Sequence, residues 1–320
     1  MADPPGSRHC VAPAVDPARY PAVSVVVATR DRPGLLERAV RHVLDQDYPG
    51  PVQCVVVFDQ VPARRLDVAP APDRELLLVT NTRRPGLPGG RNSGVAAASG
   101  ALLAFCDDDD VWLPTKLRRQ VEVLTAQPRV GAVSCGIRLH GPGIDRERRL
   151  NRARVTLAEL LTDRVMEVHS STVMVRRSTW LAAGPVDEDI PGGYSEDYEW
   201  LLRVAAHTPI ALVPEVLVVV DWHGGSFYFG RWATIAEAQR YLLAKHPELT
   251  RSRAGLARIR GQIAFALAAG HRRREAVREL AAVLRLNPRE KRVLATLPVI
   301  LGLLSGERVL RIAQRRGRGV

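Results

Sequence analysis

The stretch AVSVVVATRDRPGLLERAVRHVLDQ, residues 22–46, decides the expected fold. Its first part, Ala22–Ala28, is a run of small and β-branched apolar residues, which predicts a strand buried on both faces. A helical pattern follows from Pro33, because proline suits the first turn of a helix and apolar residues then recur at helical spacing. A doubly buried strand that leads into a helix is typical of a parallel sheet covered by helices.

Later segments repeat this order. Buried runs occur at Val52–Asp59 and Glu75–Thr80, and an alanine- and glycine-rich helix is expected over residues 90–99, before the strand that ends at Phe105. VGAVSCGI and VHSSTVMVRR, residues 130–137 and 168–177, also have strand-like composition. We therefore predict an α/β fold of Rossmann-like character with a mostly parallel sheet, whose ligands bind beyond the carboxyl ends of the strands.

The composition limits the class of protein. The chain has 320 residues, of which 46% are hydrophobic, enough for one large domain with an appendage or for two domains. Four scattered cysteines without a Cys-x-x-Cys pair indicate reduced thiols in a cytoplasmic setting. Residues 1–20 are rich in proline and alanine and predict a disordered lead-in, without the apolar run of a signal peptide. The apolar run VLATLPVILGLL is too short for a membrane span, and Pro298 interrupts it.

The net charge of +12 is concentrated at the end of the chain. From Arg231 onward there are 20 Lys/Arg and 6 Asp/Glu, a net of +14, so the preceding residues carry 26 and 28, a net of −2. We predict a catalytic domain at 21–230 and a basic helical extension at 231–320. The extension is either a solvated basic surface or a peripheral contact with the inner face of the plasma membrane. Nucleic acid is not an expected partner, because the chain has no recognition motif and few aromatic residues.

Four consecutive aspartates, in ALLAFCDDDDVW, follow the buried strand that ends at Phe105. Short acidic runs are most often solvated loops. Alternate side chains of an extended chain share a face, however, so Asp107 and Asp109 are expected to point together. Two converging carboxylates suit a hard divalent cation such as Mg²⁺ or Mn²⁺.

Two more segments carry candidate site residues. RRPGLPGGRNSG, residues 83–94, matches neither phosphate-loop pattern, but it places Arg91 beside a helix N-terminus, where a diphosphate or merely a capped surface loop would fit. GGYSEDYEWLLRVA, residues 192–205, begins a helix with Glu196 and Asp197. Acidic residues in a first turn complement the helix dipole, so this pair has a structural as well as a catalytic interpretation.

These motifs together resemble glycosyltransferase family 2. The resemblance covers about Ala22 to Ser226, and its motifs occur in the family's order: VSVVVATRDRPGLLERAV, VVVFDQ, GGRNSGVAAASGALLAFCDDDDVWLPTKL and YSEDYEWLLR. It implies a GT-A fold, a nucleotide-sugar donor and an inverting, metal-dependent transfer to an acceptor hydroxyl, as in cell-envelope or polysaccharide biosynthesis. The acceptor is a saccharide, a lipid-linked saccharide or a small molecule.

The resemblance also implies roles for individual residues. Asp109 would ligate the Mn²⁺ or Mg²⁺ that bridges the donor diphosphate, Asp107 would contact the ribose or the metal, and His223 either touches the metal or diphosphate or caps a strand. Asp197 is the implied general base, with Glu196 beside it near the acceptor. The implied nucleotide-sugar contacts are Thr29, Asp31, Asp59, Arg91 and Asp107.

The base contacts favour a UDP or TDP sugar, because a carboxylate such as Asp59 accepts the imide N–H of uracil or thymine. The chain departs from the family at Arg30-Asp31-Arg32, where relatives often carry an aromatic residue or asparagine. Two other functions remain open: a non-catalytic protein that docks on a membrane or partner, and a sugar nucleotidyltransferase, which would release pyrophosphate.

Overall fold

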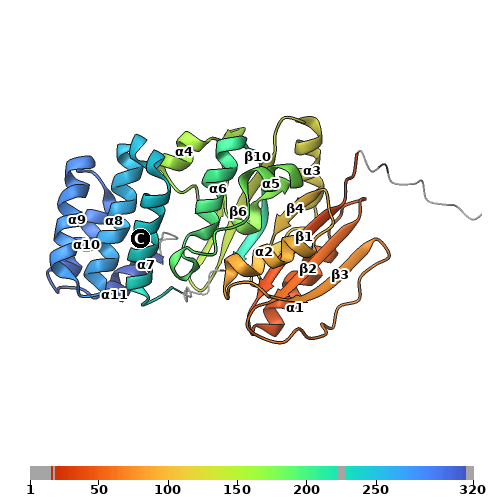
Figure 1. Ribbon diagram of the computed structural model, residues 1–320, viewed down its shortest axis with the longest axis horizontal. Coiled ribbons are helices and arrows are strands. Elements are labelled where there is room, and N and C mark those ends of the chain that lie inside the picture. The colour runs from red at the N-terminus through yellow and green to blue at the C-terminus, as the bar shows by residue number, and fades with distance from the viewer. Residues whose placement is uncertain (1–15, 17–18, 222–227, 315–320) are drawn as a thin grey trace, which may run out of the picture.

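A ten-stranded sheet forms the centre of the protein in a computed structural model, which describes residues 16, 19–221 and 228–314 (Figure 1). Its main strands lie in the order β3-β2-β1-β4-β9-β6-β10-β5, while β7 pairs with β6 and β8 pairs with β10. The strands are β1 (Val23–Thr29), β2 (Val52–Phe58), β3 (Arg74–Thr80), β4 (Leu102–Phe105), β5 (Val111–Trp112), β6 (Ala132–Gly141), β7 (Ile144–Arg148), β8 (Arg154–Val155), β9 (Met174–Arg176) and β10 (Ile210–Asp221).

The sheet is mostly parallel, as predicted. Strands β3, β2, β1 and β4 run parallel to one another, and β6 runs parallel to β10. The short β9 lies between these groups and runs antiparallel to both β4 and β6. The carboxyl ends of the parallel strands therefore meet at one edge of the sheet, which is where ligands bind in such folds.

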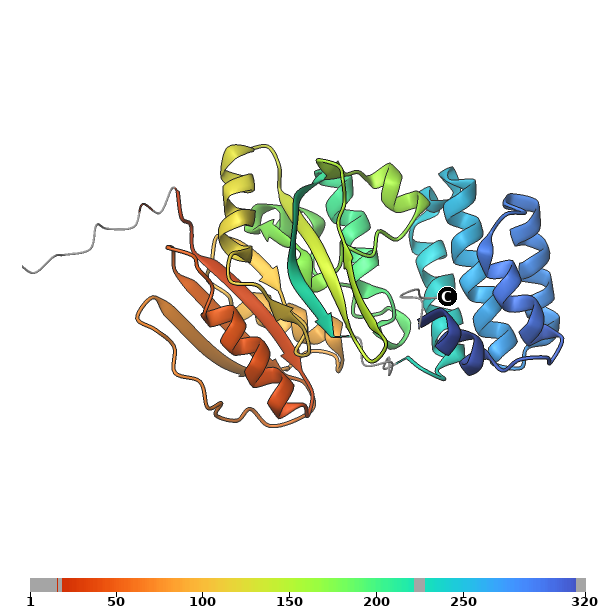
Figure 2. The same ribbon diagram turned by 180° about the vertical axis from the view of Figure 1, so that it is seen from behind.

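Helices cover both faces of the sheet. Successive side chains of β1 alternate: Val25 and Val27 pack with α1 and α3 on one face, and Val26 packs with α2, α5 and α6 on the other. Figure 1 shows α2, α5 and α6 in front of the sheet, and Figure 2 shows α1 on its other side. These helices are α1 (Pro33–Leu44), α2 (Leu87–Ala97), α3 (Lys116–Ala126), α4 (Leu157–Thr162), α5 (Arg177–Ala183) and α6 (Glu196–His207).

Two local predictions are corrected by the structure. The segment VHSSTVMVRR is a strand only over Met174–Arg176, and Ser170–Thr172 form a 3₁₀ turn. Thr172 causes this change, because its hydroxyl donates to the carbonyls of Glu167 and His169 and accepts from the His169 N–H, which competes with extended pairing. Helix α2 begins at Leu87, three residues before the expected start, because Pro88 fits its first turn.

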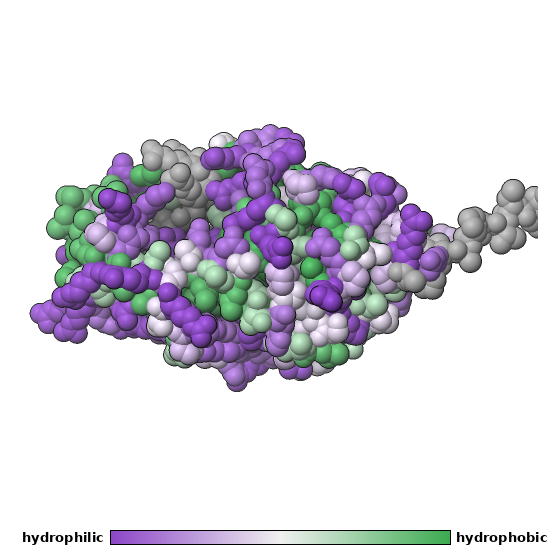
Figure 3. Space-filling model, turned by 90° about the horizontal axis from the view of Figure 1, so that it is seen from above, coloured by the Kyte–Doolittle hydropathy of each residue, from purple (hydrophilic) through white to green (hydrophobic). Residues whose placement is uncertain are grey.

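The basic extension is helical and packs against the catalytic part of the chain. One apolar core is continuous from strand residues such as Phe105 to extension residues such as Trp232 and Ile263. No helix of the described residues is long and apolar enough to cross a membrane. Apolar residues gather on the surface at the end of the molecule that these helices form (Figure 3). The helices are α7 (Trp232–Lys245), α8 (Arg253–Ala269), α9 (Arg273–Leu286), α10 (Lys291–Ile300) and α11 (Gly306–Gln314).

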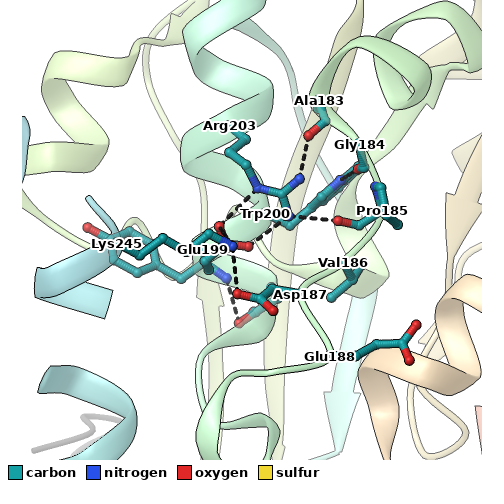
Figure 4. Close-up of polar contacts among 12 residues, drawn as sticks. Ala183, Gly184, Pro185, Val186, Asp187, Glu188, Glu199, Trp200, Arg203 and Lys245 are labelled. Carbon is teal, nitrogen blue, oxygen red and sulfur yellow. Dashed lines mark hydrogen bonds and ion pairs between the residues drawn. The ribbon is translucent and has the colours of Figure 1, made fainter. Parts of the chain in front are cut away.

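A buried carboxylate joins α6 to the extension. Glu199 is fully buried and accepts hydrogen bonds from Arg203 (2.9 and 2.7 Å) and from His246 Nε2 (2.9 Å). Lys245 Nζ lies 2.9 Å from Glu199 and 2.6 Å from Asp187, so it ties the loop before α6 to the same group (Figure 4). These cations hold the pKa of Glu199 at about 2, against the effect of burial. We call Glu199, Asp187, Arg203, Lys245 and His246 the Glu199 cluster.

Replacement of Glu199 by alanine is expected to destabilise the protein strongly. Three cationic groups would lose their common partner, and breaking a buried ion pair from one side costs roughly 3 kcal/mol or more. Glu237→Ala, at an exposed position of α7, is the matched control and should change the free energy of unfolding by less than about 0.5 kcal/mol. Equal effects of the two substitutions in urea unfolding would contradict this account.

Protonation of His246 should make the stability pH-dependent. Burial lowers its pKa, but the hydrogen bonds to Glu199 and Glu248 outweigh burial and leave the pKa raised above 6.5. Its stabilising effect is therefore complete below pH 6.5 and is lost as the pH rises through the raised value, whereas that of Glu199 is lost only on acidification toward pH 2. We expect the unfolding free energy to fall between pH 6 and 8, and to fall less in His246→Gln. An unchanged slope in His246→Gln, or the same loss of slope in the exposed His140→Gln, would contradict it.

Candidate active site

The predicted nucleotide-binding residues begin at the carboxyl ends of neighbouring strands. Thr29 ends β1, and Asp59 directly follows β2, where its N–H donates to the Thr29 carbonyl (2.9 Å). The Asp59 carboxylate accepts from Asn81 Nδ2 (2.8 Å) and from the Gly86 N–H (3.0 Å). Gly86 has a φ of 114°, which a residue with a side chain rarely adopts, so the loop before α2 depends on this glycine.

The acidic run forms a turn after β4. The Asp110 N–H donates to the Asp107 carbonyl (3.1 Å), which brings the first and fourth aspartates to one side. Asp108 accepts from Thr29 Oγ1 (2.7 Å), and Arg32 bridges Asp108 (2.6 Å) and Asp109 (2.7 Å). The expectation that Asp107 and Asp109 share a face because the chain is extended is therefore wrong.

A group that fits a divalent cation lies at this turn. One ligand atom each of Asp107, Asp110 and His169 lie within 4.8 Å of one another. His169 Nε2 is buried and has no hydrogen-bond partner among the described residues. Burial lowers the pKa of His169 despite the nearby Asp107 and Asp197, which favours the neutral imidazole that binds metals. Two carboxylates and a neutral imidazole suit a transition metal such as Mn²⁺.

The carboxylates of the turn are unbalanced without a cation. Burial raises the pKa of Asp108 to about 6, although Thr29 and Arg32 oppose it. Burial also raises the pKa of Asp110 well above its ordinary value, and the charges of Asp107 and Asp109 add to this effect. A bound cation would favour the ionised forms and lower these pKa values.

Arg91 connects the acidic turn to α6. Its side chain is only 6% exposed, and its guanidinium donates to Asp107 Oδ1 (2.9 Å) and to Glu196 Oε1. Burial lowers the pKa of Arg91, but the charges of Glu196 and Asp107 outweigh it and leave the pKa raised. The Asp107 carboxylate is fixed from the other side by Ser170, whose hydroxyl donates to Oδ2 (3.0 Å).

The two acidic residues that begin α6 have different environments. Burial, with the charges of Asp197 and Asp107, raises the pKa of Glu196 to about 7, although Arg91 opposes it. Asp197 is bound in a bidentate manner by Arg164 (2.8 and 2.7 Å), and Arg164 and Arg91 outweigh burial so that its pKa is lowered. Adjacent carboxyl groups with pKa values moved apart are typical of an acid–base site.

The helical extension supports this part of the site. Ser195, before α6, adopts a left-handed conformation with a φ of 65°, which is unusual for serine and is often held in place at functional sites. Its hydroxyl lies 3.3 Å from Gln239 Nε2 of α7 and 3.4 Å from Arg164 Nη1. The turn that presents Asp197 is thus contacted from both the catalytic part and the extension.

The structure brings most of the predicted residues to one edge of the sheet. Asp107, Arg91, Glu196 and Asp197 form one connected network, whereas Asp109 is paired with Arg32 and its metal role stays a prediction. Asp31 is exposed and has a φ of 53°. Three more predicted contacts have different outcomes: Thr29 and Asp59 lie at the predicted edge, and His223 lies outside the described residues.

Sequence reasoning missed His169, Arg164 and Asp110 as site residues. His169 and Arg164 lie more than 50 positions after the acidic run, in a segment whose residue types carry no metal or catalytic motif. Asp110 was visible as a fourth aspartate, but only the turn geometry distinguishes it from Asp109.

Comparison with known proteins identifies the family. Residues 24–180 match the family described as glycosyl transferase family 2. The chain belongs to glycosyltransferase family 2. A family member, the succinoglycan biosynthesis protein ExoO of Rhizobium meliloti, is 37% identical over 112 residues, which cover 34% of this chain and 31% of ExoO.

A second relative is the Escherichia coli UDP-Glc:alpha-D-GlcNAc-diphosphoundecaprenol beta-1,3-glucosyltransferase WfgD, 29% identical over 102 residues, or 32% of this chain and 40% of WfgD. The matches span roughly a third of the length of these curated relatives. The mannosyltransferase PcManGT of Pyrobaculum calidifontis, solved with GDP-Man and Mn²⁺, aligns with 93% of this chain and 85% of its own at a TM-score of 0.56 and 22% identity. That similarity supports the GT-A fold.

Proposed function

We propose that this family 2 protein transfers a sugar from a nucleoside-diphosphate donor to an acceptor hydroxyl with inversion, using Asp197 as the general base. The observation that carries the proposal is the connection of Asp197, through Arg91 and Glu196, to the acidic turn that fits a metal. An acceptor-side base and a donor-side acidic group are the two parts that an inverting transfer requires.

The donor nucleotide is proposed to lie over the strand ends that carry Thr29 and Asp59, with Asp31 at the rim. WfgD is named for UDP-Glc and PcManGT was solved with GDP-Man, so relatives and neighbours differ in the nucleotide. We favour UDP or TDP, because the Asp59 carboxylate suits the imide N–H of a pyrimidine. To bind a base, Asp59 would have to exchange one of its contacts with Asn81 or Gly86.

A divalent metal is proposed to lie at the acidic turn, held by Asp107, Asp110 and His169, or by Asp109 if its carboxylate leaves Arg32. Mn²⁺ or Mg²⁺ bound there would offset the charge of a departing diphosphate. The predicted contact of Arg91 with the diphosphate requires it to release a carboxylate. In its present position Arg91 fixes Asp107 relative to Glu196.

The proton chemistry is assigned to Asp197. Its lowered pKa keeps the carboxylate ionised near neutral pH, so it can accept the proton of the acceptor hydroxyl as that oxygen attacks the sugar. Glu196, with a pKa near 7, is proposed to contact the acceptor. Arg164 occupies the Asp197 carboxylate, so an acceptor hydroxyl would have to share or displace this ion pair.

The acceptor is proposed to be a saccharide carried on a lipid diphosphate. The printed function of WfgD includes diphosphoundecaprenol, and ExoO is named for the biosynthesis of a polysaccharide. A saccharide end or a small molecule would use the same base.

Metal binding can be tested without turnover. Since even outer partners of metal ligands cost about 10–100-fold in affinity, we expect His169→Ala and Asp110→Asn to weaken Mn²⁺ binding by at least about tenfold. Electron paramagnetic resonance of free Mn²⁺ measures this loss. Asp109→Asn decides between the two ligand sets, and Asp145→Asn, on the exposed strand β7, is the control. Wild-type affinity in both His169→Ala and Asp110→Asn would remove these two residues from the site.

The transfer reaction is tested with a panel of UDP, TDP and GDP sugars, Mn²⁺ or Mg²⁺, and lipid-diphosphate saccharides as acceptors. We expect release of a nucleoside diphosphate and a decrease in kcat of at least about 100-fold in Asp197→Asn. Arg164→Met should raise the pKa of Asp197 and move the acidic limb of the kcat/KM profile to higher pH, while Asp145→Asn leaves it unchanged. Release of pyrophosphate would identify a nucleotidyltransferase, and an active Asp197→Asn would exclude it as the base.

A further inference from the structure

Helix α10 and the turn after it leave large apolar side chains in solvent. Leu294, Leu297, Leu301 and Leu303 are 75%, 40%, 66% and 71% exposed. We call these four residues the outer leucine face. Single exposed leucines are ordinary, but a cluster in adjacent turns of one segment marks an interaction surface.

The outer leucine face is not required by the core of the extension. Val293 is buried against α8 and α9, and Thr296 and Val299 are also buried. These three residues recur at helical spacing and form the inner side of α10, so Leu294 and Leu297 lie on another side of the same helix. Figure 3 shows apolar residues at this end of the molecule, next to hydrophilic ones.

Basic side chains surround this apolar surface. Helix α9, which packs with α10 on α8, exposes Val277 and Leu284 together with several arginines. The acidic residues of the two helices are already paired: Glu275 with Arg240 and Arg272, Glu279 with Arg260, and Glu290 with Arg292. Five exposed cations of this region form no ion pair within the described residues: Arg274, Arg278, Arg285, Arg289 and Lys291.

We propose that the outer leucine face and these five cations dock the protein on an anionic lipid bilayer. Leucines that enter the acyl boundary and cations that meet phosphate headgroups use both components of the surface. A second copy of the chain would bring two sets of unpaired cations together, and nucleic acid would leave the leucines without a partner. This surface is separate from the acidic turn, so docking does not depend on the proposed transfer.

Docking is measured with the full chain and sedimented vesicles, of phosphatidylcholine alone or mixed with phosphatidylglycerol. We expect binding only to the anionic vesicles, weakening with salt. A double change of Leu294 and Leu301 to glutamine should weaken binding by at least about tenfold, as each change removes an aliphatic group from the lipid. Arg278→Gln, Arg285→Gln and Lys291→Gln together should weaken it by about fivefold per cation.

Matched controls keep the test specific. Leu181 of α5 is 72% exposed, so Leu181→Gln is the control for the leucines, and Arg64→Gln with Arg65→Gln and Arg129→Gln is the control for the cations. All of these positions are exposed, so the variants should fold, and their thermal unfolding verifies this. The proposal is overturned if the protein ignores anionic vesicles, if the controls lose as much binding, or if light scattering shows a dimer that the leucine changes dissociate.

Discussion

The candidate site depends on one buried guanidinium, that of Arg91. It lies between Asp107, at the end of a central strand, and Glu196, at the start of α6. Three carboxyl groups and an arginine in so little space would repel or remain desolvated if either partner were absent. Arg91 thus fixes the distance between the acidic turn and the helix that carries Asp197, and it separates the pKa values of Glu196 and Asp197.

The helical extension belongs to this arrangement. Glu199 lies one turn after Glu196 on α6 and is bonded to His246 and Lys245 of the extension, while Gln239 contacts Ser195 at the start of the same helix. The extension therefore anchors α6 at two points. Its outer surface, with exposed leucines and unpaired cations, is directed away from these contacts, which allows one segment to support the site and to meet a membrane.

Much of the site was predictable from residue types and their order. Buried β-branched strands alternating with helices predict where strands end, and Thr29, Asp59 and the acidic run follow such ends. Asp197 in the first turn of a helix was predicted as well. The choice among the aspartates was not predictable, because the argument assumed an extended chain where the protein forms a turn. His169 escaped prediction because a histidine gains metal-binding character only from what lies beside it.

The sequence by itself determined the α/β class, the parallel strands, the position of the acidic residues and the basic helical end, because these follow from local pattern and composition. Only the tertiary structure decided which of those acids meet. The pairing of Arg164 with Asp197 and of Arg91 with both Asp107 and Glu196 joins residues separated by 16 to 105 positions. Such contacts, and the pKa values that they set, depend on burial and distance, which no local pattern encodes.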